Sequence, residues 1–247
     1  MNEKYWDLVS ANYEKEITSV FFRDKEGLVR ERINAGRKLG ASVRAADLGC
    51  GVGNFVPLLS ETFGHVDACD WSEVGLNQAR ENCISFENTK FHKINLCNDR
   101  LPFDLVDFAL CVNVLIMPDL GDRLLAWRAV TNQVKGAGTL LLVVPSHESA
   151  QMELYNGLEQ CLSDGESCSD SIIATQHAEA DSSDLQLGVY SVNGTRTKHY
   201  LKQELRMMLA SHQFEVLEIT RIVYPKDVEN PVSDSWDWMV VAKRRLS

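Results

Sequence analysis

Apolar and polar positions follow two different periods along this chain. Short apolar runs typical of buried strands lie at 42–48, 65–70, 90–96, 106–114 and 139–144. The segments between them carry apolar residues at helical spacing, which predicts helices at 54–63, 71–83 and 122–134. Strands that alternate with helices in this way predict a doubly wound α/β fold with a mostly parallel sheet and right-handed crossovers.

Polar residues and glycines mark the boundaries of these elements. Asn54 and Ser72 stand where a side chain can accept a hydrogen bond from the open N–H groups of a helix, so both are predicted N-caps. Gly136 and Gly138 are expected to separate the helix at 122–134 from the strand that follows.

Both ends of the chain add further elements. Amphipathic helices are expected at 3–16 and 24–39. Towards the other end, Asn193-Gly194 between two β-prone runs predicts a hairpin, followed by a helix at 201–211. Two last strands, at 214–223 and 236–243, are expected to close the sheet as an antiparallel pair.

The regular alternation stops after Pro145. Residues 146–195 contain nine acidic residues and no lysine or arginine. A helix is expected at 148–162 and a loop at 163–171. We interpret the segment as a solvated acidic cover, with a substrate-selecting element as the alternative.

Composition limits the class of protein. The chain has 247 residues and a formal net charge of −10, so it suits one domain and gives no broad electrostatic surface for nucleic acid or an anionic membrane. No apolar run is long enough to span a bilayer, and the first residues do not resemble a signal peptide. The seven cysteines form no CxxC pair, so neither a disulfide framework nor a metal site is expected, and a cytoplasmic location is predicted.

The glycine-rich stretch DLGCGVG between the first predicted strand and its helix carries the chemistry. Gly49, Gly51 and Gly53 are spaced GxGxG, unlike the GxGxxG of a dinucleotide turn, and no P-loop motif occurs in the chain. Asp47 lies two residues before the first glycine and would repel a pyrophosphate but suit a cationic ligand. Asp70 ends the next strand, where a carboxylate can accept hydrogen bonds from ribose hydroxyls.

These motifs resemble those of class I S-adenosylmethionine-dependent methyltransferases. The resemblance runs over about residues 40–145, through ADLGCGVGN, VDACDWS, NLCNDRLPF and DFALCVNVLIMPD. It implies a seven-stranded sheet with a reversed last strand. It also implies a single domain over 1–247: a helical lid at 1–40, a cofactor-binding core at 41–145, the acidic insertion at 146–195 and the rest of the sheet at 196–247.

The resemblance further implies roles for individual residues of the turn. Gly49, Cys50 and Gly51 are expected to lie under the methionine and ribose parts of S-adenosyl-L-methionine, and Gly53 is expected to be a further cofactor-binding residue. Asp47 would serve the amino group of the cofactor, Asp70 the ribose hydroxyls and Trp71 the adenine.

Residues outside the turn complete the expected site. Asn95 and Leu96 follow the third strand on the adenine side, while Asn113 and Val114 follow the fourth strand and face the methionine part. Trp6 and Tyr13, with Tyr5, form an aromatic stripe that is either core packing or a lid over the cofactor. His147 and Tyr200 are candidates for a catalytic role, and a structural role is the alternative for both.

The methyl acceptor is open at this point. The acidic charge favours a small molecule, either an amine or a cationic compound. Arg196, Lys198 and Lys202 lie close together and support the alternative of a tRNA or protein acceptor. A protein that binds the cofactor without transferring a methyl group is a third alternative. The sequence does not set an oligomeric state.

Overall fold

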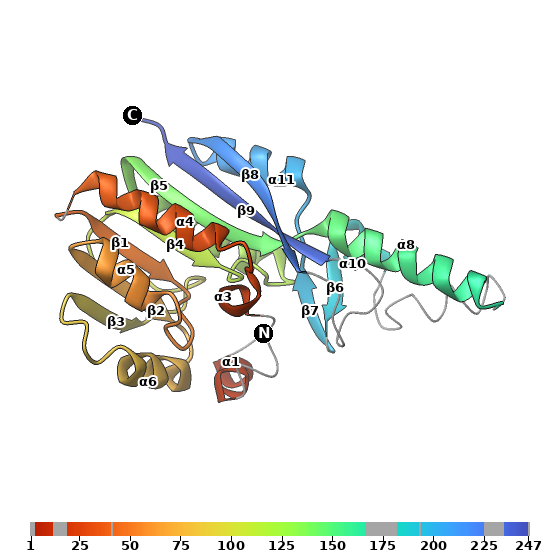
Figure 1. The fold of residues 1–247 in the computed structure, drawn as a ribbon, viewed down its shortest axis with the longest axis horizontal. Helices are drawn as coiled ribbons and strands as arrows, with labels where there is room; N and C mark the ends of the chain where they lie inside the picture. Colours follow the sequence, from red (N-terminus) through yellow and green to blue (C-terminus); the bar gives the residue numbers. More distant parts are fainter. Residues whose placement is uncertain are drawn as a thin grey trace.

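Seven strands form one mixed sheet at the centre of the protein (Figure 1). The computed structural model describes residues 3–11, 19–40, 42–165, 182–192, 194–224 and 235–246. The strands of the sheet are β1 (Arg44–Leu48), β2 (His65–Asp70), β3 (Thr89–Lys93), β4 (Val106–Val112), β5 (Val134–Pro145), β8 (Phe214–Tyr224) and β9 (Ser235–Arg244). Their order is β3-β2-β1-β4-β5-β9-β8. Strands β1 to β5 are parallel to one another, and β9 is antiparallel to both β5 and β8. The predicted fold class, with its reversed last strand, is confirmed.

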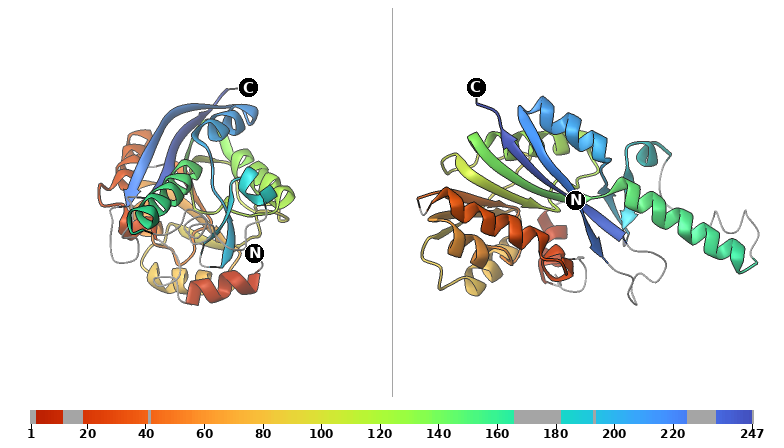
Figure 2. Two further views of the ribbon diagram at one scale, coloured as in Figure 1. Left: turned by 90° about the vertical axis from the view of Figure 1, so that its right-hand side faces the viewer. Right: turned by 45° about the horizontal axis from the view of Figure 1, so that its top comes forward.

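Helices cover both faces of this sheet (Figures 1 and 2). One face carries α4 (Leu28–Ala35), α5 (Val56–Thr62) and α6 (Glu73–Asn82), and the other carries α7 (Leu120–Asn132) and α11 (Lys202–Ser211). Leu141 of β5 packs in the first layer, whereas Leu140 and Leu142 pack with Trp127 in the second. Because successive strand residues face opposite sides, a strand covered on both sides needs an unbroken apolar run.

The N-terminal segment attaches to the core through its first helix. It contains α1 (Glu3–Ala11), α3 (Val20–Arg23) and the short 3₁₀ turn η1 (Gly36–Leu39). Asp7 of α1 accepts a hydrogen bond from the hydroxyl of Ser72 at 2.6 Å, and Ser72 in turn accepts from the Gly75 N–H at 3.0 Å. Ser72 is thus the N-cap of α6, as predicted, and it also holds α1 against this helix.

The insertion after β5 forms its own small unit. It consists of α8 (His147–Ser163), α10 (Ser182–Gln186) and a separate two-stranded sheet of β6 (Val189–Val192) and β7 (Thr195–Lys198). Helix α8 extends away from the body of the protein (Figure 1). The predicted helix and hairpin are confirmed, while most of the loop predicted at 163–171 lies outside the described residues.

Two boundary predictions are wrong. Asn54 does not cap α5: the turn continues through Gly53, whose carbonyl accepts from the Val56 N–H at 3.1 Å, and the helix begins only at Val56. Gly136 and Gly138 do not end a helix before β5 but lie within that strand, which starts at Val134 and contains Ala137 with a φ of 63°. A bulge accommodates the glycines in an extended chain.

No helix among the residues described is long and apolar enough to cross a membrane.

Candidate cofactor site

The predicted residues that follow β1, β2, β3 and β4 lie at the carboxyl edge of the sheet, around the point where strand order reverses. Strands β2 and β3 lie on one side of β1 in the sheet, whereas β4 and β5 lie on its other side. The order of the strands reverses between β1 and β4, so the crevice lies between these two strands. In open α/β sheets, ligands bind in this crevice.

The glycine turn after β1 is tied to the next strand through its backbone. The N–H groups of Gly49 and Cys50 donate to the Cys69 carbonyl at 2.8 and 2.9 Å. Gly49 has a φ of 94°, and a Cβ on this residue would overlap the side chain of Val114. Only glycine combines this backbone conformation with so close a neighbour.

Asp70 joins the turn to the helix that follows β2. Its Oδ2 accepts from the Gly51 N–H at 2.8 Å and its Oδ1 from the Ser72 N–H at 2.9 Å. Burial raises the pKa of Asp70, and the backbone donors act in the opposite direction. A carboxylate has about four lone-pair positions, so each oxygen of Asp70 keeps capacity for a ligand hydroxyl.

Asp47 is a buried carboxyl group in the same turn. It is 3% exposed. Burial, followed by the negative charge of Asp70, raises the pKa of Asp47 to about 8. Its carboxyl group accepts no hydrogen bond from any part of the chain that the structure describes. A buried acid in this state favours a ligand that brings a positive charge or an N–H donor.

Asn113 and Val114 face the turn from the end of β4. Asn113 has a φ of 54°, and its N–H donates to the Val143 carbonyl at 2.9 Å. Its Nδ2 donates to Asp237 at 3.3 Å, while its Oδ1 is buried without a hydrogen-bond partner. Asn113 therefore links the end of β4 to β5 through its backbone and to Asp237 through its side chain.

The residues expected on the adenine side lie at the ends of β2 and β3. Trp71 is half-buried directly after β2. The side chain of Asn95 accepts from the Cys97 N–H at 3.0 Å, and Asp99 accepts from the Asn95 N–H at 2.6 Å. Leu96 is buried in the core beneath this turn. The adenine contacts of these residues stay a prediction.

The proposed aromatic lid is described only in part. Trp6 lies on α1, half-buried, with its ring edge-on to Tyr5 at 5.1 Å between centroids. Tyr13 lies outside the described residues. Helix α1 packs on α6, so it borders the site from the side of Trp71.

His147 and Tyr200 lie beyond β5, where the insertion begins and ends. His147 is buried, with its Nε2 at 3.4 Å from the Tyr190 hydroxyl, and burial followed by the charge of Lys198 lowers its pKa. Tyr200 donates its hydroxyl to the Leu115 carbonyl at 2.6 Å and accepts from Trp127 at 3.1 Å. These contacts favour a structural role for Tyr200.

Sequence reasoning did not single out three polar residues near the edge. Asp7 holds α1 on α6, and Asp237 accepts from the Tyr224 hydroxyl at 2.8 Å next to Asn113. An aspartate between two tryptophans in the run SWDWMVV was the available signal for a buried acid.

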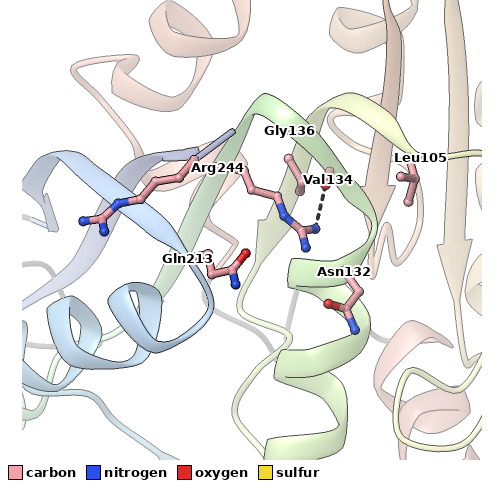
Figure 3. A pocket seen from close by; sticks show the side chains of 7 residues that line it. Leu105, Asn132, Val134, Gly136, Gln213 and Arg244 are labelled. Carbon is pink, nitrogen blue, oxygen red and sulfur yellow. Dashed lines mark hydrogen bonds between the residues drawn. The ribbon is translucent and has the colours of Figure 1, made fainter. Parts of the chain in front are cut away.

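A separate pocket of about 380 Å³ lies at the other end of the strands, where the parallel strands begin (Figure 3). It opens where β5 begins and β9 ends. Asn132, Gln213 and Arg244 surround it, and the Arg244 guanidinium already donates to the carbonyls of Thr131 and Val134, each at 2.8 Å. This pocket is not part of the crevice between β1 and β4.

Comparison with known proteins agrees with this geometry. Residues 45–138 match the family model of a methyltransferase domain. A SAM-dependent methyltransferase from Methanosarcina mazei superposes with a TM-score of 0.62 at 18% identity, covering 84% of this chain and 95% of that one. The N-methyltransferase NodS from Bradyrhizobium japonicum WM9, solved with S-adenosyl-L-homocysteine, gives 0.63 at 10% identity, covering 98% and 97%. The [4+2]-cyclase SpnF gives 0.60 at 13% identity, covering 89% and 81%.

No curated protein has a sequence that matches this chain at a significant level. At identities this low, the structural likeness shows the fold. The family match over residues 45–138 and the fold support a class I S-adenosylmethionine-dependent methyltransferase, in agreement with the resemblance seen in the sequence.

Proposed function

We propose that this protein binds S-adenosylmethionine in the crevice between β1 and β4 and transfers its methyl group to a small-molecule acceptor. The observation that carries the proposal is the buried Asp47 carboxyl group, which accepts no hydrogen bond from the described residues and lies beside a glycine turn that leaves no room for a side chain. The ammonium group of the cofactor supplies the donor that this carboxyl group lacks.

The other residues of the edge fit the rest of the cofactor. Asp70 is held by two backbone N–H groups and keeps lone pairs for two ribose hydroxyls. Trp71 supplies a flat face for the adenine, with Asn95 and Leu96 on the far side, and Cys50, Gly51 and Gly53 provide the backbone surface of the turn.

For methyl transfer, the protein mainly has to align the methyl group with the acceptor. The bound cofactor supplies an electrophilic methyl group on a sulfonium. The residues of this chain orient that group and the acceptor and exclude water from between them. We include α1 in this role as a lid, because Asp7 and Ser72 attach it to the helix that follows the ribose-binding Asp70.

The charges of the C-terminal region support a small acceptor over RNA. Of the three basic residues that suggested RNA binding, Arg196 forms a bidentate pair with Asp184, and Lys198 is 3% exposed and bonded to Glu204 at 2.8 Å. Lys202 lies over the Trp238 ring at 5.4 Å. Paired basic residues give little attraction for phosphates.

The acidic residues of the insertion do not all lie exposed to solvent. Glu148 accepts from the Lys202 N–H at 2.9 Å and from Trp238 at 3.1 Å, so it holds the fold together. Glu159 is exposed on α8. We propose the insertion as the cover of the acceptor side.

The described cysteines are all free thiols, which supports the expected cytoplasmic location.

One labelling experiment tests this function. The protein is incubated with methyl-labelled S-adenosylmethionine and a cell extract, which is then separated into small-molecule, RNA and protein fractions. We expect label in the small-molecule fraction, loss of transfer in Asp70→Ala, and normal transfer in Asp104→Ala, a control at an exposed position. Label confined to RNA or protein would contradict the acceptor class. Cofactor binding with no label in any fraction would favour a role without methyl transfer, as the cyclase on this fold makes conceivable.

A further inference from the structure

A second polar cluster lies at the same edge, one hydrogen bond away from the cofactor crevice. It consists of Asp237 on β9, Tyr224 at the end of β8 and Asn113 after β4, and we call it the Asp237 cluster. The Tyr224 hydroxyl donates to the Asp237 Oδ2 at 2.8 Å, and the Asn113 Nδ2 donates to the same oxygen at 3.3 Å.

Strand topology brings these distant residues together. Because β9 is antiparallel to β5, its first residues lie at the carboxyl edge, and Asp237 pairs with Pro145 on one side and Ile222 on the other. Along the edge, Gly49 is followed by Val114 and Asn113, and then by Asp237. Asn113 therefore connects the turn on β1 to the cluster on β8 and β9.

The cluster has more acceptors than donors. Both donors reach the same oxygen of Asp237, and the Oδ1 accepts no hydrogen bond from the residues described around it. Asp237 is 8% exposed and Tyr224 is 3% exposed, so little water reaches the group. The Asp237 Oδ1 therefore keeps its lone pairs for a ligand that brings a hydrogen-bond donor.

Neighbouring charges set the electrostatics of the cluster. The Arg23 guanidinium of α3 lies 4.9 Å from the centre of the Tyr224 ring. Burial raises the pKa of Asp237, whereas Tyr224, Asn113 and Arg23 lower it. Burial and the charge of Asp237 raise the pKa of Tyr224, so its hydroxyl stays protonated and donates.

We propose that the Asp237 cluster is the subsite for the methyl acceptor and that it selects an acceptor with an N–H or O–H donor, either an amine or an alcohol. The proposal rests on the proposed function. The cluster lies beyond Asn113 as seen from the glycine turn, which is where a second molecule must stand to meet the methionine end of the cofactor. A free carboxylate oxygen attracts a donor and repels acceptors that carry a phosphate or carboxylate.

Matched variants test the subsite. Asp237→Asn removes the carboxylate with little change in shape, and Tyr224→Phe removes only the hydroxyl that positions it. Glu218→Gln is the control, because it also removes a carboxylate from β8. The Glu218 carboxylate accepts from Arg32 at 2.9 Å and is not part of the Asp237 cluster. Each protein is titrated calorimetrically with S-adenosylhomocysteine, and transfer is measured against dilutions of the labelled small-molecule fraction.

The expected pattern separates acceptor binding from cofactor binding. Asp237→Asn raises the apparent KM for the acceptor about ten- to hundredfold. Tyr224→Phe raises it less, because Asn113 still holds the carboxylate. The Kd for S-adenosylhomocysteine changes less than about twofold in both. With this nucleoside bound, the acceptor fraction raises the Tm of the wild type and of Glu218→Gln but not of Asp237→Asn.

Other results would overturn the subsite. Unchanged KM in both variants, parallel loss of S-adenosylhomocysteine binding, or a labelled acceptor without an N–H or O–H group would each do so. If Asp237→Asn does not fold, Tyr224→Phe alone decides. A wild type that binds no S-adenosylhomocysteine contradicts the proposed function itself, and this outcome is distinct from the others.

Discussion

Replacing Asp47 with asparagine removes an ionisable group from the proposed cofactor site while keeping the size of the side chain. In the protein without cofactor, burial and the charge of Asp70 raise the pKa of Asp47 from 3.8 to about 8. The folded chain therefore holds one more proton than the unfolded chain at any pH between these values. A carboxyl group of this kind stabilises the fold fully below pH 3.8, and the contribution is lost as the pH rises through about 8.

The magnitude follows from this difference in bound protons. In the wild type, the contribution of Asp47 to the free energy of unfolding falls by about 1.4 kcal/mol for each pH unit in this window. Asparagine does not ionise. The stability of the wild type relative to Asp47→Asn should therefore decrease by about 3 kcal/mol between pH 5 and pH 7.

Denaturant unfolding of both proteins without cofactor at pH 5, 6 and 7 measures this difference. Asp107→Asn is the control, because the pKa of Asp107 is lowered by the Arg44 N–H and by Lys135, which places its titration below this pH range. Parallel stability curves for the wild type and Asp47→Asn would refute the assignment of a buried, protonated Asp47. Binding of S-adenosylhomocysteine should strengthen up to about tenfold per pH unit from pH 6 to 8 in the wild type and stay flat in the variant.

Three further changes test other parts of the site. Gly49→Ala should destabilise the protein by about 1–3 kcal/mol in chemical denaturation, because of its left-handed backbone and its overlap with Val114; the double variant with Val114→Ala should recover part of this loss, and no recovery would show that the backbone alone is responsible. Asp70→Ala should weaken S-adenosylhomocysteine about ten- to hundredfold in calorimetry, and an unchanged Kd would remove Asp70 from the ribose site. Asp7→Ala should release α1 from Ser72, seen as faster hydrogen exchange in α1 together with weaker cofactor binding. Faster exchange with unchanged binding would leave α1 a packing element.

Local patterns predicted the part of the site that local sequence builds. The turn at Gly49 and the acid at Asp70 each follow an apolar strand within a few residues, and parallel strands end at one edge, so their meeting was predictable. Ser72 was recognised as a cap for the same reason. Asn54 was misplaced because the positive φ of Gly53, 83°, lengthens the turn before the helix starts.

The rest depends on contacts between distant residues. The bond between Asn113 and Asp237 joins β4 to a strand that lies beyond β5 in the sheet. Only the antiparallel pairing of β9 brings Asp237 to the edge, and no periodicity in the sequence specifies that register. The pairing of Arg196 with Asp184 is another example, because a basic run in the sequence becomes a neutral surface only once α10 packs on the hairpin.

The two ends of the insertion meet in the fold. The Tyr200 N–H donates to the Pro145 carbonyl at 2.8 Å, and the His147 N–H donates to the Tyr200 carbonyl at 3.0 Å, while the Tyr200 side chain anchors this junction in the core. The polypeptide between these points therefore starts and finishes at one place. Since the entropy of closing a loop grows only slowly with its length, this stretch can be shortened, lengthened or exchanged for that of another methyltransferase without stretching the sheet. Under the proposed function, such grafts would change the cover of the acceptor side and leave the strands of the sheet unchanged.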